Sequence, residues 1–189
     1  LDAGCGEGYY LRQLAAAESP VKTLAVLGLD ISKWAVLSAA KQDKRPKWVV
    51  GSNANLPVLP GTLDRLLCMF GFPVYPEFAR VLKADGLLLQ VDAGADHLRE
   101  LREIIYPTLK QDRPVDAQVP ANFVYQSSET VRYPLSLSGK EQIADLLAMT
   151  PHLYRASAEG RAKAAALTEI EITVDVRLTC FKRDTKQIK

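Results

Sequence analysis

The feature that most constrains the fold is a glycine-rich turn at the start of the chain, Leu1-Asp2-Ala3-Gly4-Cys5-Gly6-Glu7-Gly8. Its first residues read as the end of a buried strand, and residues 9–17 have the apolar spacing of a helix. Glycine tolerates positive φ and lets the backbone approach a ligand, while the N–H groups that begin a helix point at the ligand's polar part. A strand, such a turn and a helix therefore predict a cofactor-binding α/β unit.

The rest of the chain alternates strand and helix patterns, which is typical of a parallel sheet covered by helices on both faces. Strand patterns cover 23–29, 48–50, 64–70, 87–92, 131–137 and 169–181, and helix patterns cover 33–41, 76–82, 97–110 and 139–149. A strand needs about five residues, so we expect most of the first strand to lie upstream of Leu1. These patterns predict one Rossmann-like α/β domain over residues 1–189, with a mostly parallel sheet and a truncated first strand.

The composition is that of a globular chain, with 48% apolar residues, 24% charged residues and a net charge of +2. So small a charge gives no strong overall field toward nucleic acid or an anionic membrane. The apolar runs are too short to span a membrane, and no signal-peptide pattern is present. The three cysteines, Cys5, Cys68 and Cys180, are too scattered for a disulfide framework or a zinc site. We expect a cytoplasmic protein with no metal and no membrane partner.

The spacing of the turn distinguishes between cofactors. A dinucleotide fingerprint has the spacing Gly-x-Gly-x-x-Gly, whereas this chain has Gly4-x-Gly6-x-Gly8 with Glu7 inside the turn. A carboxylate there would repel a pyrophosphate but tolerates the cationic methionine end of S-adenosylmethionine. The turn favours S-adenosylmethionine, and a dinucleotide is the alternative.

Two further positions fit this cofactor. Asp30 ends the second strand pattern, about twenty residues after the turn, where a carboxylate can accept both ribose hydroxyls. Helix capping and simple solvation are the other interpretations of Asp30. Asn53 and Ala54 follow the third strand pattern, where a polar side chain can reach the adenine amino group, and an ordinary polar loop is the alternative.

Several longer segments match a known family. Two carry the cofactor motifs: Leu-Asp-x-Gly-Cys-Gly-Glu-Gly-Tyr-Tyr at 1–10 and Gly-Leu-Asp-Ile-Ser-Lys at 28–33. A third, Ala-Arg-Val-Leu-Lys-x-x-Gly at 79–86, precedes the fifth strand pattern. More specific are His97-Leu98, Glu100-Leu101, Ile105-Tyr106 and Leu146-Leu147-x-Met149-Thr150-Pro151. Together they resemble the class I S-adenosylmethionine-dependent methyltransferases, and in detail the bacterial large-subunit (23S) rRNA guanine-N1 methyltransferases.

The resemblance implies methyl transfer from S-adenosylmethionine to N1 of a guanine in large-subunit rRNA, with S-adenosylhomocysteine as product, rRNA as partner and a possible homodimer. It implies a cofactor site made of Asp2, Gly4, Gly6, Glu7, Asp30, Ile31, Asn53, Ala54, Phe70 and His97. The family also has an N-terminal zinc module with clustered cysteines, which residues 1–189 do not contain. We therefore expect this chain to be the catalytic domain.

The catalytic residues stay open at this stage. Methyl transfer mainly requires the methyl group and the nucleophile to be held in contact, and a base or acceptor near guanine N1 should help because N1 carries a proton. Asp92 ends the fifth strand pattern and His97 follows it, at the edge of the sheet where ligands bind. Phe70, Phe72 and Tyr75 can stack on an extruded base. Capping or solvation of His97 and core or rim packing of the aromatic rings are the alternatives.

Two other functions remain compatible with the motifs. A class I methyltransferase of a small molecule is favoured by the modest net charge. A non-catalytic S-adenosylmethionine-binding module is favoured by Gly71-Phe72-Pro73, where the family has Ala-Pro.

Overall fold

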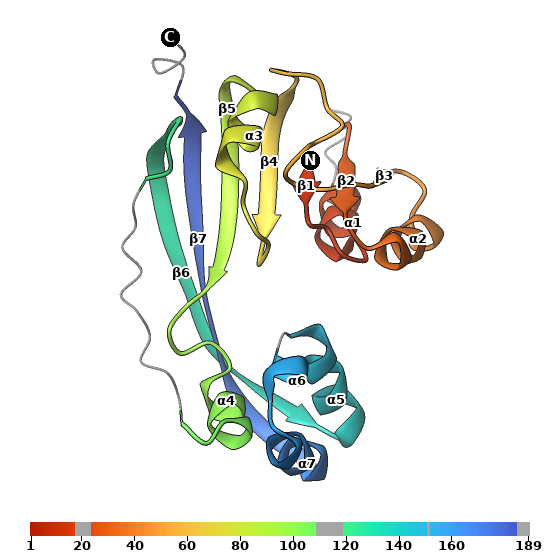
Figure 1. The fold of residues 1–189 in the computed structure, drawn as a ribbon, viewed down its shortest axis with the longest axis vertical. Helices are drawn as coiled ribbons and strands as arrows, with labels where there is room; N and C mark the ends of the chain where they lie inside the picture. Colours follow the sequence, from red (N-terminus) through yellow and green to blue (C-terminus); the bar gives the residue numbers. More distant parts are fainter. Residues whose placement is uncertain (18–23, 109–118, 151, 185–189) are drawn as a thin grey trace. The chain divides into compact units, whose positions relative to one another are not determined.

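The structure is a computed structural model that describes residues 1–17, 24–108, 119–150 and 152–184 (Figure 1). The chain divides into two compact units, and each has its own apolar core. Unit 1 takes the described residues of Leu1–Asp92, Ala117–Ser128 and Leu178–Lys189, and unit 2 those of Ala93–Asp116 and Glu129–Arg177. The single domain over residues 1–189 stays a prediction.

The strands form one seven-stranded sheet in the order β3-β2-β1-β4-β5-β7-β6. They are β1 (Asp2–Ala3), β2 (Leu27–Asp30), β3 (Lys47–Val50), β4 (Leu63–Met69), β5 (Leu82–Ala93), β6 (Phe123–Ser138) and β7 (Glu169–Arg183). The pairings among β1 to β5 are parallel, and the arrow of β7 runs opposite to those of β5 and β6 (Figure 1). The mostly parallel Rossmann-like sheet predicted from the sequence is confirmed.

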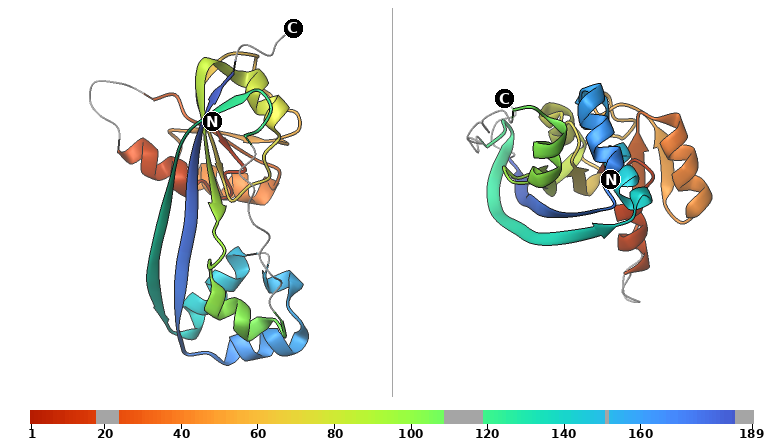
Figure 2. Two further views of the ribbon diagram at one scale, coloured as in Figure 1. Left: turned by 90° about the vertical axis from the view of Figure 1, so that its left-hand side faces the viewer. Right: turned by 90° about the horizontal axis from the view of Figure 1, so that it is seen from below.

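The helices belong to two groups. In unit 1 they are α1 (Tyr9–Ala16), α2 (Lys33–Gln42) and α3 (Tyr75–Val81). In unit 2 they are α4 (Arg99–Ile105), α5 (Lys140–Met149), α6 (His152–Arg155) and α7 (Ala158–Ala166), and they gather on one side of β6 and β7 (Figure 2). The predicted N-cap of α2 is present, because Ser32 Oγ accepts a hydrogen bond from the Ala35 N–H at 3.3 Å.

Each core follows from the apolar pattern of its elements. In unit 1, Leu29 of β2, Leu66 of β4 and Leu88 of β5 are buried together with Phe78 of α3. In unit 2, the apolar stripes of α4 and α5 pack with α7 and β7; the fully buried side chains include Leu101, Ile105, Ile143 and Ile172. Gly160 of α7 lies against the carbonyl of Ile105, where any Cβ would overlap that carbonyl. The apolar spacing of the strand and helix patterns in the sequence therefore predicts most of the buried residues of both cores.

Several predicted boundaries were wrong. The strand expected at 87–92 begins at Leu82, because Leu82 already pairs with Leu63 and the register shifts before the next pair, Arg65 with Leu87. The helix expected at 97–110 is described only as Arg99–Ile105, and Pro107 disfavours helical backbone at Tyr106. The strand expected at 131–137 begins at Phe123, since its exposed polar residues obscure the alternation.

Two helices were not predicted. The apolar residues of α7 are alanines, which are too small to mark an apolar face, and α6 is a single turn. The strand predicted at 23–29 also began too early, because β2 begins at Leu27, and Thr23 lies outside the described residues. The loop predicted at 111–120 lies outside them too, apart from residues 119–120.

Candidate cofactor-binding site

The carboxyl ends of the parallel strands of unit 1 meet at one edge of the sheet. The N–H groups of Gly4 and Cys5, after β1, donate to the Leu29 carbonyl of β2 at 2.8 and 3.0 Å. The loop after β4 reaches the same place, since a Cβ on Gly71 would lie 3.3 Å from the Ala3 carbonyl oxygen. These contacts bring the loops after β1, β2 and β4 together, as the general rule for ligand sites in open α/β sheets requires.

The glycine turn faces open space at two of its three glycines. Gly4 and Gly6 have φ of +89° and +53°, and a Cβ added to either would meet nothing within 4 Å. Gly8 differs, because a Cβ there would overlap the ring of Trp48. Packing therefore explains the glycine at position 8. At positions 4 and 6 the backbone conformation requires glycine and leaves room for a ligand.

Asp30 links the turn to the start of α2. Its Oδ2 accepts a hydrogen bond from the Gly6 N–H at 2.9 Å, and its Oδ1 accepts one from the Ser32 N–H at 2.8 Å. Each carboxylate oxygen has two lone pairs, so each keeps one for a further donor such as a ribose hydroxyl. The capping interpretation and the ribose interpretation of Asp30 are thus compatible.

Asp2 is the most unusual polar residue of the site. Its side chain is fully buried, and neither carboxylate oxygen has a hydrogen-bond partner among the described residues. Burial raises the pKa of Asp2 to about 6, and the Asp30 carboxylate adds to the rise. A buried carboxylate without a partner is costly, and a cationic ligand group beside it would offset that cost.

Glu7 points to α2. Its Oε2 accepts hydrogen bonds from Ser38 Oγ at 3.0 Å and from Gln42 Nε2 at 3.4 Å. These bonds tie the turn to a helix that follows the next strand. Direct contact of Glu7 with a cofactor stays a prediction.

The expected adenine contacts lie in the loops after β2, β3 and β4. Ile31 is 77% exposed beside Asp30 and offers an apolar surface. Asn53 Nδ2 donates to the Phe72 carbonyl at 3.2 Å, so the other end of this amide, Oδ1, is the acceptor available to an amino group. The Ala54 N–H donates to Ser52 Oγ at 3.2 Å. Phe70 has a positive φ of 53° and is half-exposed.

Two of the catalytic candidates lie in unit 1. Asp92 Oδ2 accepts a hydrogen bond from Gln90 Nε2 at 2.8 Å, and Gln90 Oε1 accepts one from the Tyr75 hydroxyl at 2.9 Å. The Tyr75 ring packs on the core and meets Phe123 edge to face, so packing is its role. Phe72 is 86% exposed. Core packing is therefore excluded for Phe72, and stacking on a base stays a prediction.

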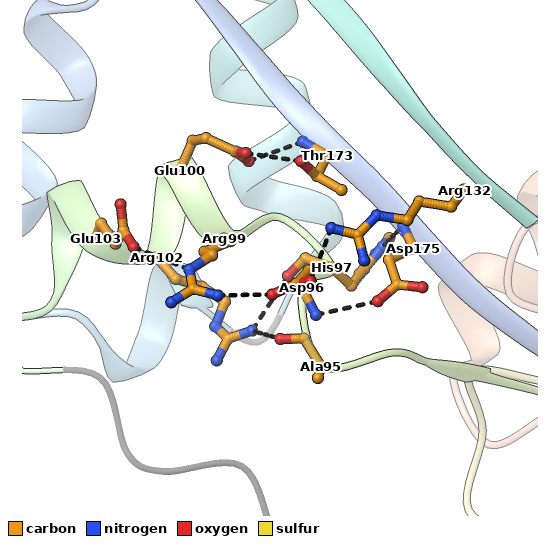
Figure 3. Close-up of polar contacts among 10 residues, drawn as sticks. All are labelled: Ala95, Asp96, His97, Arg99, Glu100, Arg102, Glu103, Arg132, Thr173 and Asp175. Atoms are coloured by element: carbon orange, nitrogen blue, oxygen red, sulfur yellow. Dashed lines mark hydrogen bonds and ion pairs between the residues drawn. The ribbon is translucent and has the colours of Figure 1, made fainter.

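His97 belongs to unit 2, where it joins β7 through a hydrogen bond (Figure 3). Its Nδ1 accepts from the Asp175 N–H at 3.3 Å, and burial lowers the pKa of His97. The neutral ring then carries its proton on Nε2, which makes Nε2 a donor rather than a base. The expected position of His97 beside the cofactor stays a prediction.

Polar contacts around His97 connect the segment before α4 to β6 and β7 (Figure 3). The buried carboxylate of Asp175 accepts from the Asp96 N–H at 3.0 Å, and the Asp96 carboxylate pairs with Arg99 and Arg132, each at 2.7 Å. Sequence reasoning missed Arg132 and Asp175, because both lie in strands far along the chain from Asp96.

The part of the chain that the structure describes holds no group of three or more His, Cys, Asp or Glu residues able to bind a metal. Within the same residues, no helix has the length and apolar character needed to cross a membrane.

Comparison with known proteins agrees with this geometry. Residues 1–86 match the family model of a methyltransferase domain. The chain is 33% identical over 181 residues to a putative 23S rRNA (guanine-N(1)-)-methyltransferase of Bacillus subtilis, covering 93% of this chain and 64% of that protein. It is 35% identical over 189 residues to a protein of the same description from Micromonospora griseorubida, covering 96% and 62%. The chain thus spans less than two thirds of the length of these relatives.

Solved structures share the fold. The YcgJ protein of Bacillus subtilis has a TM-score of 0.63 at 20% identity, over 97% of this chain and 90% of that one. A putative methyltransferase from Bacillus halodurans has a TM-score of 0.59 at 16% identity, over 97% and 91%. The class I methyltransferase fold expected from the resemblance is confirmed.

Proposed function

We infer that this chain is a class I methyltransferase that transfers a methyl group from S-adenosylmethionine to N1 of a guanine in large-subunit rRNA. The geometry of unit 1 supports the cofactor. The names of relatives at 33% and 35% identity support the acceptor, and rRNA is accordingly the proposed partner.

The observation that carries the cofactor is the buried Asp2 carboxylate without a described partner, next to a turn that faces open space. S-adenosylmethionine has a sulfonium and an ammonium, and either cation near Asp2 would favour the ionised carboxylate. A dinucleotide would instead bring an anionic pyrophosphate to the turn beside Asp2. The charges at this edge therefore favour S-adenosylmethionine.

The residues present divide the work of binding. Asp30 would hold the ribose hydroxyls, and Ile31 and Asn53 Oδ1 the adenine. When bound, the cofactor supplies a methyl group on a good leaving group. The protein mainly has to orient that methyl group toward the acceptor, and orientation supplies roughly 7–11 kcal/mol in well-oriented reactions.

Binding of S-adenosylmethionine to the full-length protein, measured by calorimetry, tests the cofactor. We expect Asp30→Ala to weaken binding at least tenfold. The control is Asp64→Ala, because Asp64 is 71% exposed at the start of β4 and pairs with Lys83. A full-length protein that does not bind S-adenosylmethionine would overturn the proposal.

Methylation of unmodified 23S rRNA, followed by nucleoside mass analysis, tests the acceptor. The expected product is N1-methylguanosine. Methylation of small molecules but never of RNA would favour the small-molecule methyltransferase. Binding of S-adenosylmethionine without any transfer would favour the non-catalytic module.

A further inference from the structure

Phe72 is an exposed aromatic ring on a loop whose backbone is held in place. Of the five phenylalanines, Phe78, Phe123 and Phe181 are buried and Phe70 is 48% exposed, whereas Phe72 is 86% exposed. A large apolar side chain with so much exposure contributes little to folding. A single exposed apolar side chain is common in itself, so the role of Phe72 depends on the loop that presents it and on the position of that loop.

Three contacts fix the backbone of this loop. The Phe70 N–H donates to the Val91 carbonyl at 2.8 Å, and Asn53 Nδ2 donates to the Phe72 carbonyl at 3.2 Å. Gly71 packs so closely that a Cβ would lie 3.1 Å from Cys68 Sγ. Pro73 adds a local restriction, because the residue before a proline is confined to extended backbone. The ring of Phe72 is therefore presented from a braced loop.

The loop lies at the edge of unit 1 that carries the candidate cofactor site. Gly71 is next to the Ala3 carbonyl, which immediately precedes the glycine turn. Asn53 connects the loop after β3, where the adenine is expected, to the carbonyl of Phe72 itself. A planar acceptor held by the Phe72 ring would thus lie at the same edge as the cofactor.

We propose that the Phe72 ring is the surface on which the acceptor base stacks, and that Asn53 is the residue that positions it. This inference rests on the proposed function and names the residue that would recognise the planar face of the guanine. Stacking on an aromatic ring is tolerant of base identity, so Phe72 supplies affinity and orientation, not the choice of N1.

The test compares aromatic and non-aromatic substitutions in the full-length protein. Phe72→Leu and Phe72→Ala lower kcat/KM for rRNA about 5- to 100-fold, the range expected from loss of one base–aromatic stack. Phe72→Tyr retains the ring and restores activity to within about threefold of the wild type. The affinity for S-adenosylmethionine stays within about twofold for all three variants, because the ring lies outside the predicted cofactor contacts.

Asn53→Ala removes the bond to the Phe72 carbonyl. It raises KM for rRNA by more than its loss of affinity for S-adenosylmethionine alone explains. The matched control is Leu59→Ala, since Leu59 is an apolar residue of unit 1 that is 74% exposed in the loop before β4. It leaves both rRNA kinetics and cofactor affinity unchanged. Thermal unfolding of each variant checks that the fold is kept.

Each outcome has a distinct meaning. Equal activity of wild type, Phe72→Ala and Phe72→Leu would overturn the stacking role while leaving the methyltransferase function intact. Loss of cofactor affinity in Phe72→Ala would overturn it by assigning the ring to the cofactor site. A wild-type protein that binds S-adenosylmethionine and methylates no rRNA would overturn the acceptor and the stacking role together.

Discussion

The carboxylate of Asp30 accepts a hydrogen bond from the backbone N–H of Gly6 at 2.9 Å, which joins the turn after β1 to the end of β2. Gly6 adopts φ of +53° with open space where a Cβ would stand. The acidic residue thus holds the glycine turn in the conformation that leaves room for a ligand. A sequence motif and a separate acidic residue prove to be parts of one structure.

This arrangement predicts different effects at two glycines with similar backbones. Gly6 and Gly61 have φ of +53° and +64°, and a Cβ on either meets nothing within 4 Å. Alanine in this conformation costs about 1–2 kcal/mol, so Gly6→Ala and Gly61→Ala should lower the free energy of unfolding similarly. Only Gly6→Ala should abolish binding of S-adenosylmethionine, as calorimetry can measure. Equal binding by both variants would place the cofactor elsewhere.

The pKa of Asp2 predicts how stability varies with pH. The folded pKa of about 6 lies above the unfolded value of 3.8, so the stabilisation from protonated Asp2 is complete below pH 3.8 and is lost as the pH rises through 6. The difference corresponds to about 3 kcal/mol. The free energy of unfolding of Asp2→Asn should therefore increase relative to that of the wild type as the pH rises from 4 to 7, as denaturant titrations can measure. A difference in free energy of unfolding that stays constant over this range would show that the pKa of Asp2 is not raised.

The same group predicts the pH dependence of cofactor binding. A cationic ligand favours ionised Asp2, so affinity for S-adenosylmethionine should fall as the pH drops below about 6. The affinity of Asp2→Asn should be weaker at pH 8 and nearly independent of pH in this window. If both proteins showed the same pH profile, Asp2 would not face the cation.

The hydrogen bonds between Glu100 and Thr173 predict that unit 2 loses stability when Glu100 is replaced. Its carboxylate accepts bonds of 2.7 Å from both the N–H and the hydroxyl of Thr173. Burial opposes ionisation of Glu100, but these bonds prevail and lower its pKa. Glu100→Ala should cost about 2 kcal/mol of stability, because it leaves a donor of β7 unpaired. The exposed neighbour Glu103 is the control, and Glu103→Ala should cost well under 1 kcal/mol.

His97 predicts a particular tautomer. Because Nδ1 accepts from the Asp175 N–H, the neutral ring should carry its proton on Nε2, and its pKa should lie below 6.5. Nitrogen chemical shifts of the labelled histidine measure both properties. A proton on Nδ1 near neutral pH would contradict the hydrogen bond.

Much of the candidate site follows from the sequence because its residues lie at the ends of strand patterns. The turn after β1, Asp30 at the end of β2 and Asn53 after β3 are predicted in this way, since the carboxyl ends of parallel strands share one edge. The partners of these residues are not predicted. Glu7 lies in the turn as expected, yet its carboxylate accepts a hydrogen bond from Ser38, 31 residues later.

The parts of the fold that the sequence did not reveal have specific physical causes. The alanines of α7 pack by close approach of backbones at Gly160, which leaves no apolar stripe to recognise. The start of β5 is irregular because the register shifts between Leu63 and Arg65. β6 is exposed along most of its length, so its alternation carries no apolar signal.

The most direct measurement uses methyl-deuterated S-adenosylmethionine, the full-length protein and unmodified 23S rRNA, with mass analysis of the digested nucleosides. The predicted result is deuterium-labelled N1-methylguanosine, at a yield that Asp30→Ala abolishes and Asp64→Ala preserves. Label absent from every guanine, or equal labelling by wild type and Asp30→Ala, would contradict the proposed function.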